Sequence, residues 1–187
     1  VVVKEVKLWS DELDRPLLHS IFFGGGTPSL IGAERIGRIV EAVRESFEFK
    51  TEIEISLEAN PEDLSTRQIE KLYSVGLNRL SFGVQSFNPL LLGRLGRCHN
   101  ESTVRDGVLW ARRAGFDNLS FDLIYGIPTQ TFHDWQESLN VAVSLEPDHI
   151  STYELSLEPW TKMGQWVKSG EEQLPGEDSV IEMYEWS

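Results

Sequence analysis

The sequence predicts an α/β fold in which parallel strands alternate with helices, either curled into an incomplete barrel or arranged as a doubly wound sheet. Five short runs with the composition of strands support it: residues 19–23, 52–57, 79–83, 118–125 and 148–155. The segments between these runs have helical spacing. Strands joined through single helices need right-handed crossovers, and such crossovers make the sheet parallel.

Each expected helix has a local signal of its own. The clearest helix places its apolar side chains on one stripe: Ile36, Ile39, Val40, Val43 and Phe47. A second stripe consists of Trp135, Leu139, Ala142 and Val143. The helix expected over 101–114 ends at Gly115, where the missing β-carbon permits a left-handed cap. Another helix starts within 63–66 and ends before Gly76.

Composition limits the classes of function. The chain has 187 residues, 40% of them hydrophobic, which is enough to bury the core of one domain. Its formal charge of −13 argues against a large surface for nucleic acid or anionic lipid. No apolar run approaches the roughly 20 residues of a membrane span, and the first residues lack the basic start and apolar core of a signal peptide. We therefore expect a cytoplasmic protein that neither spans a membrane nor binds nucleic acid.

The cysteine content and the two ends of the chain are informative as well. Its single cysteine, Cys98, excludes an internal disulfide and supplies too few thiols for a cysteine-built metal site. Both ends look cut, because the chain begins without Met in an amphipathic stretch and stops inside a helical pattern at 179–186. We expect further residues on both sides.

Polar residues gather where the expected strands end. In chain order they are the glycine-rich segment 24–28, Glu58, Asn60, Gln85, Asp122, Tyr153, Glu154 and Ser156. Parallel strands are covered on both faces and should read as apolar, so this distribution needs an explanation. Ligands bind at the carboxyl ends of the strands in barrels and in doubly wound sheets alike. The pattern therefore indicates a ligand site.

The glycine-rich segment 24–28 allows two interpretations. Three residues without side chains let backbone N–H and C=O groups come within hydrogen-bonding distance of a ligand, such as a free amino acid group. The alternative is a tight strand-to-helix turn in which Pro28 ends the strand. The spacing fits neither a Rossmann fingerprint nor a P-loop.

Asp122 interrupts an apolar strand. Alternation places Phe121, Leu123 and Tyr125 on one face and Asp122 with Ile124 on the other. Burying an unpaired carboxylate costs several kcal/mol, so Asp122 needs donors. Ribose hydroxyls, a lysine or backbone amides would all serve. A ligand contact and a structural ion pair therefore both stay open.

The other polar candidates are weaker when each is taken alone. Glu58 and Gln85 leave their strands at positions where a polar side chain is most often simply solvated. Arg97 has a planar fork that suits a carboxylate, but a surface salt bridge explains it equally well in so acidic a chain. His99 can transfer a proton near neutral pH, although most lone histidines do not.

Four blocks in order resemble the radical S-adenosylmethionine (SAM) family that contains oxygen-independent coproporphyrinogen III oxidase and the haem chaperone HemW. They are FFGGGTPS at 22–29, SLEANP at 56–61, SFGVQSF at 81–87 and DLIYGIP at 122–128. The resemblance covers nearly the whole chain. It implies a partial TIM-like β/α barrel of parallel strands, truncated at both ends. Residues 1–158 would form the radical SAM core, and 159–187 would begin a C-terminal region.

The resemblance also implies a site for SAM. Its backbone part would be Gly25, Gly26 and Thr27, which receive the amino acid end, and its side-chain contacts would be Glu58, Gln85, Arg97 and Asp122. Arg97 would meet the carboxylate and Asp122 the ribose, with Ile124 and Ser156 near the adenine. In the family, a [4Fe–4S] cluster cleaves the bound cofactor to a 5′-deoxyadenosyl radical.

The family's C-x-x-x-C-x-x-C loop is absent from this sequence, and Cys98 cannot replace it. We place the loop before Val1, assign no catalytic or metal-ligating residue within the chain, and expect these residues alone to be inactive in radical chemistry.

Four segments resemble the HemW branch rather than the oxidases: 95–100, 157–159, 174–178 and 183–185. That branch implies haem or a porphyrin as a further ligand and respiratory haem proteins as its recipients. Trp160 and Trp166 are either packing residues or the lining for such a flat apolar ligand. Two alternatives stay open. One is the oxidase, which decarboxylates coproporphyrinogen III. The other is a non-radical barrel enzyme, which would need a lysine or an anion-binding loop at a strand exit.

Overall fold

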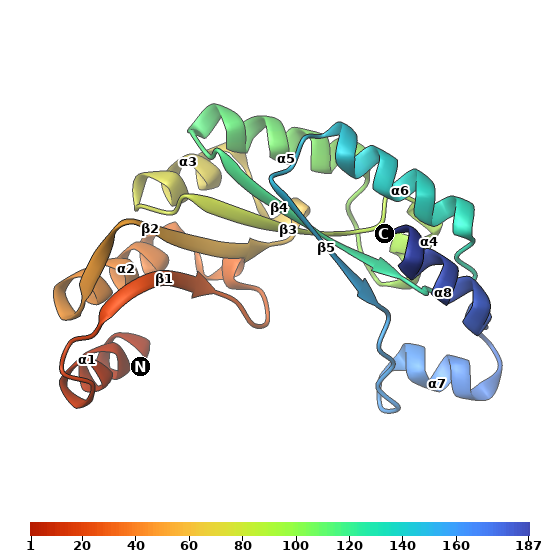
Figure 1. Cartoon of the computed structure of the whole chain (residues 1–187), viewed down its shortest axis with the longest axis horizontal. Helices are drawn as coiled ribbons and strands as arrows, with labels where there is room; N and C mark the ends of the chain where they lie inside the picture. The colour runs from red at the N-terminus through yellow and green to blue at the C-terminus, as the bar shows by residue number, and fades with distance from the viewer. The chain divides into compact units, whose positions relative to one another are not determined.

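The computed structural model describes residues 1–187, and strands and helices alternate along them as predicted (Figure 1). The elements are α1 (Val2–Glu12), β1 (Leu17–Phe23), η1 (Pro28–Ile31), α2 (Ala33–Ser46), β2 (Glu48–Ala59), η2 (Pro61–Asp63), α3 (Thr66–Ser74), β3 (Arg79–Gln85), α4 (Pro89–Arg94), α5 (Glu101–Ala114), β4 (Asn118–Tyr125), α6 (Phe132–Ser144), β5 (His149–Glu154), α7 (Lys162–Ser169) and α8 (Glu177–Trp186). The five strands form one sheet in chain order. The pairs β1 with β2, β2 with β3 and β4 with β5 are parallel.

Two compact units make up the chain. The first contains residues 1–82 and 106–119, and the second contains 83–105 and 120–187. No helix has both the length and the apolarity that crossing a membrane requires.

In the first unit, the helices follow their sequence signals. The stripe of α2 buries Ile36 and Val40, and α1 lies against α2 (Figure 1). Helix α3 begins with a capping box, in which Ser65 Oγ accepts the Gln68 N–H and Gln68 Oε1 accepts the Ser65 N–H. The chain leaves α3 through Gly76, whose φ of +101° favours a residue without a β-carbon.

Strand β2 has one apolar and one polar face. Ile55, Leu57 and Ala59 are buried on one face, and Ser56, also buried, shares the opposite face with the half-buried Glu58. In the register, Ser56 lies beside Phe22 of β1 and Arg79 of β3, and Glu58 lies beside Ser81 of β3. Polar side chains therefore recur on one face of β2 and β3, and this is the face that carries Glu58.

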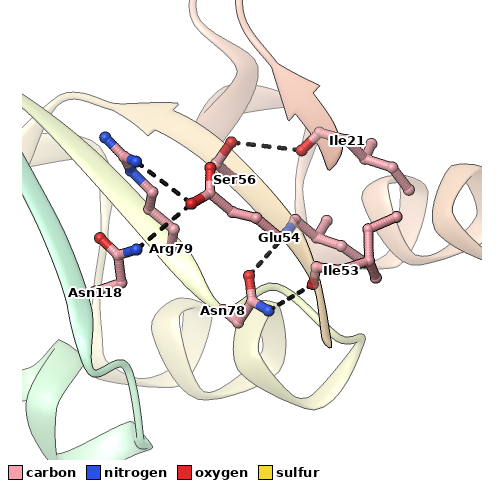
Figure 2. A network of polar contacts seen from close by, with 8 residues as sticks. Ile21, Ile53, Glu54, Ser56, Asn78, Arg79 and Asn118 are labelled. Carbon is pink, nitrogen blue, oxygen red and sulfur yellow. Dashed lines mark hydrogen bonds and ion pairs between the residues drawn. The ribbon is translucent and has the colours of Figure 1, made fainter. Parts of the chain in front are cut away.

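Figure 2 shows how polar groups tie the strands of this unit together. Asn78 bridges two backbone groups of β2, since its Oδ1 accepts the Ile55 N–H at 2.7 Å and its Nδ2 donates to the Ile53 carbonyl at 2.8 Å. Glu54 Oε2 accepts from Arg79 at 3.4 Å and from Asn118 at 3.5 Å. These contacts lie toward the start of β3, several residues before the strand exits, so they support the framework rather than a ligand.

In the second unit, α6 carries Trp135 on its buried face, where this side chain is 0% exposed. The indole Nε1 donates to the Met183 carbonyl of α8 at 3.0 Å, and the ring lies 5.4 Å from that of Tyr125. Figure 1 shows α8 beside α6. Val143, which we expected on the buried stripe, is 62% exposed. At about 100° per residue it lies some 80° around the helix from Trp135, at the edge of the apolar face.

Candidate functional site

The glycines after β1 are there for different reasons. A β-carbon on Gly24 would overlap the ring of Phe22, so a side chain at that position would displace this exposed ring. Gly25 has a φ of +107°, a conformation that side chains disfavour. Gly26 has neither constraint, because a β-carbon built there meets nothing within 4 Å. The fold itself therefore gives no reason for the missing side chain of Gly26, and its exposed backbone is open to a ligand.

The exit of β2 lies level with these glycines. Phe23 pairs with Leu57, so Gly24 and Glu58 are the next residues on two neighbouring strands. Glu58 is half-buried on the polar face, and Thr27 Oγ1 donates to the Gly26 carbonyl at 2.7 Å. The first unit thus brings the backbone of Gly25 and Gly26 to the same edge of the sheet as the Glu58 carboxylate.

Asp63 joins the two exits, a role that we did not predict from the sequence. Its Oδ2 accepts from Asn60 Nδ2 at 2.8 Å and from Ser29 Oγ at 3.3 Å. Ser29 follows the glycine segment, whereas Asn60 follows β2 directly. The available signal was the Asn-x-x-Asp spacing after β2, but the link to Ser29 joins residues that lie 34 positions apart. Asp63 therefore holds the two loops of the first unit together.

In the second unit, β4 has the predicted faces. Phe121, Leu123 and Tyr125 are buried, whereas Asp122 and Ile124 are half-buried on the opposite face. Burial, and then the nearby carboxylate of Glu154, raises the pKa of Tyr125 above its ordinary value.

Strand β5 supplies the neighbours of this polar face. Asp122 pairs with Ser151 and Ile124 with Tyr153, so the four side chains form two adjacent rows. The Leu155 N–H extends the ladder by donating to the Tyr125 carbonyl at 2.9 Å. Ser156 follows one residue later and is exposed. It lies two residues past the last residue of β5, at the strand exit.

The remaining candidates of the second unit lie at the end of β3 and on the loop between α4 and α5. Gln85 is the last residue of that strand and is half-buried with a φ of +63°. Arg97 follows Gly96, whose φ is +68°, and is also half-buried. His99 is only 5% exposed, and its Nε2 lies 2.9 Å from the Val84 carbonyl oxygen. Cys98 is exposed.

The predicted set therefore falls into two groups. Gly25, Gly26, Thr27 and Glu58 belong to the first unit, and Gln85, Arg97, Asp122, Ile124 and Ser156 belong to the second. Within each group the residues lie on polar strand faces, at strand ends or on the loops that follow. The structure contains no group of three or more His, Cys, Asp or Glu side chains that could hold a metal ion.

A parallel sheet with helical crossovers and polar residues at its strand exits defines a ligand-binding domain of the β/α-barrel class. Residues 1–142 match the radical SAM superfamily, and the chain belongs to that superfamily. The coproporphyrinogen III oxidase HemN of Escherichia coli, a radical SAM enzyme, superposes with a TM-score of 0.86 at 27% identity, over 98% of this chain and 42% of that one. The predicted partial TIM-like barrel of parallel strands is confirmed.

Two relatives are similar in sequence over almost the whole chain. The haem chaperone HemW of Bacillus subtilis is 38% identical over 91% of this chain and 45% of its own length. HemW of Haemophilus influenzae is 36% identical over 97% of this chain and 46% of its own length. The chain thus spans about half the length of the relatives that it matches, and the predicted resemblance to the HemW branch is confirmed.

Proposed function

We propose that this chain binds SAM through residues at its strand exits. The backbone of Gly25, Gly26 and Thr27 would take the amino acid end, with Arg97 on the carboxylate and Glu58 and Gln85 as further polar contacts. Asp122 would accept hydrogen bonds from the ribose, and Ile124 and Ser156 would lie near the adenine. The observation that carries the proposal is Gly26, which is glycine without any packing or backbone requirement.

The local chemistry of both groups fits this ligand. An exposed glycine backbone offers N–H and C=O groups to a zwitterionic amino acid. Asp122 stands beside the apolar Ile124 on one strand face, which suits a ribose next to an adenine ring. The proposal concerns binding and orientation, and assigns no proton or electron transfer to these residues.

The residues of this chain were also compared with what the iron–sulfur cluster of the superfamily requires. A [4Fe–4S] cluster is held by several cysteine thiolates, whereas the chain has one cysteine and no group of metal ligands. These residues do not fit the cluster. We propose that its ligands come from another part of the full-length protein, and that residues 1–158 are the SAM core and 159–187 the start of a C-terminal region.

We further propose that the full-length protein is a haem chaperone that passes haem to respiratory haem proteins. The support is the similarity to two proteins named as haem chaperones, at 38% and 36% identity over nearly the whole chain. Trp160 and Trp166 offer exposed aromatic surface for a porphyrin. Location in the cytoplasm stays a prediction from composition. The oxidase is the second candidate, because HemN superposes over 98% of the chain.

One experiment separates the two candidates. Haem is titrated into the full-length protein, and the same preparation, with its cluster reconstituted, is given coproporphyrinogen III and SAM under anaerobic, reducing conditions. A chaperone produces a saturable shift of the Soret band and no decarboxylated porphyrin. Protoporphyrinogen formed at a rate proportional to the protein concentration would establish the oxidase instead. Serum albumin, which binds haem without specific delivery, serves as the control for the spectral change.

A further inference from the structure

The end of β3 has an unusual backbone conformation. Gln85 has a φ of +63°, in the left-handed region, although it is not a glycine. The Ser86 N–H donates to the Val84 carbonyl at 2.7 Å, so residues 84–86 close a γ-turn around Gln85. A γ-turn with positive φ is a strained conformation, and it persists only where surrounding groups hold it. The structure therefore needs a feature that keeps this turn closed.

His99 is that feature. Its Nε2 lies 2.9 Å from the Val84 carbonyl oxygen, the same atom that accepts the Ser86 N–H. A carbonyl oxygen can only accept, so the Nε2 of His99 carries the proton and donates it. The two donors together use both lone pairs of this oxygen. His99 is buried, which protects the bond from competition with water.

The other side of the turn is fixed as well. Ser86 is buried, and its Oγ accepts the Asn88 N–H at 3.1 Å. Ser138 Oγ of α6 accepts the Phe87 N–H at 3.3 Å. The backbone is therefore held before and after Gln85, while the Gln85 side chain itself remains half-buried. This is the arrangement expected where a fold aims a side chain.

We propose that His99 is a positioning residue that sets the direction of the Gln85 side chain toward SAM by holding the Val84 carbonyl in the turn. The inference rests on the proposed function, in which Gln85 contacts the cofactor. Without the His99 donor, the turn can relax toward an extended backbone, which turns the Gln85 side chain away from its position. The role differs from proton transfer, because the Nε2 proton is already committed to the Val84 carbonyl.

A double-mutant cycle on the full-length protein tests this role. The dissociation constant of SAM is measured by calorimetry for the unmodified protein, His99→Leu, Gln85→Ala and the double variant. We expect each single change to weaken binding about tenfold. The double variant should bind no more weakly than Gln85→Ala alone, because His99 acts through Gln85. A general structural role would instead make the two losses multiply, which would overturn the proposal.

Two matched variants sharpen the result. His99→Gln retains a side-chain N–H and should restore at least part of the affinity lost in His99→Leu. His133→Leu replaces a histidine of the same unit whose side chain is 77% exposed, and it should leave affinity unchanged. If His99→Leu does not fold, His99→Asn, with an amide too short to reach the carbonyl, takes its place in the cycle. Unchanged affinity in folded His99→Leu or His99→Asn would also overturn the role.

Failure of the proposed function gives a different pattern. If Gln85→Ala binds SAM as tightly as the unmodified protein, Gln85 is not a cofactor contact, and a positioning role for His99 is excluded with it. If Gln85→Ala weakens binding but His99→Leu does not, only the inference about His99 fails.

Discussion

Replacing Trp135 with alanine is expected to lower the free energy of unfolding of the second unit by about 3 to 5 kcal/mol, the range for a fully buried aromatic side chain. The indole is 0% exposed, packs against Tyr125 and donates to the Met183 carbonyl. The substitution leaves a cavity and removes one of the two side-chain donors to the Met183 carbonyl, the other being Ser187 Oγ. Because Met183 belongs to α8, that helix should also become sensitive to proteases.

The measurement is urea unfolding followed by circular dichroism, with limited proteolysis of α8 as a local readout. Trp135→Phe keeps an aromatic ring but loses the N–H, so it should lower the free energy of unfolding by less than Trp135→Ala does. Trp160→Ala removes a side chain that is 75% exposed and should change stability by no more than about 0.5 kcal/mol. Equal midpoints for Trp135→Ala and Trp160→Ala would show that α6 does not depend on this side chain.

Replacing Asp122 with alanine is expected to weaken SAM binding by about 1 to 3 kcal/mol, which corresponds to roughly 5- to 150-fold in the dissociation constant. The reason is that the methyl group of alanine cannot accept the hydrogen bonds that the carboxylate would accept from the ribose hydroxyls. Asp122→Asn keeps an acceptor oxygen and should lose less affinity for SAM than Asp122→Ala. Asp106→Ala, at an exposed position of α5, is the matched control.

For Asp122→Ala, both the affinity for SAM and the stability of the fold are measured. Equilibrium dialysis gives the dissociation constant, and thermal unfolding shows whether the variant keeps its fold. A well-folded Asp122→Ala protein with unchanged affinity would remove Asp122 from the proposed site. A comparable loss in Asp106→Ala would attribute the effect to charge in general, since the chain has a formal charge of −13.

The sequence predicted the strands and their faces well, because period-two alternation is a local property. Strand β4 begins and ends as predicted, and Asp122 lies on the face opposite Phe121 and Leu123. Helix α5 ends before Gly115, where φ is +108°, as the glycine indicated. The first residues of β2, 48–51, were missed because Phe49 is their only apolar residue, which is too little to show a strand pattern.

Features that depend on tertiary contacts were beyond sequence reasoning. The short helices α4 and α7 have too few residues to establish a period. The link from Asp63 to Ser29 requires the two exits to be neighbours in space. The positive φ of Gln85 has no signal in the residue type, because glycine and asparagine are the residues that usually adopt it. The residue type of His99 likewise gave no indication that its side chain supports the end of β3.

The central claim is that the strand exits of this chain bind SAM, and Gly26 tests it most directly. SAM is titrated into the full-length protein and into Gly26→Val, with Gly93→Val as a control at an exposed glycine that likewise has no neighbour within 4 Å of a built β-carbon. Both variants should unfold at nearly the same temperature as the unmodified protein. We predict that only Gly26→Val binds SAM at least about tenfold more weakly, because its side chain occupies the space of the ligand. Equal affinity in all three proteins would contradict the account.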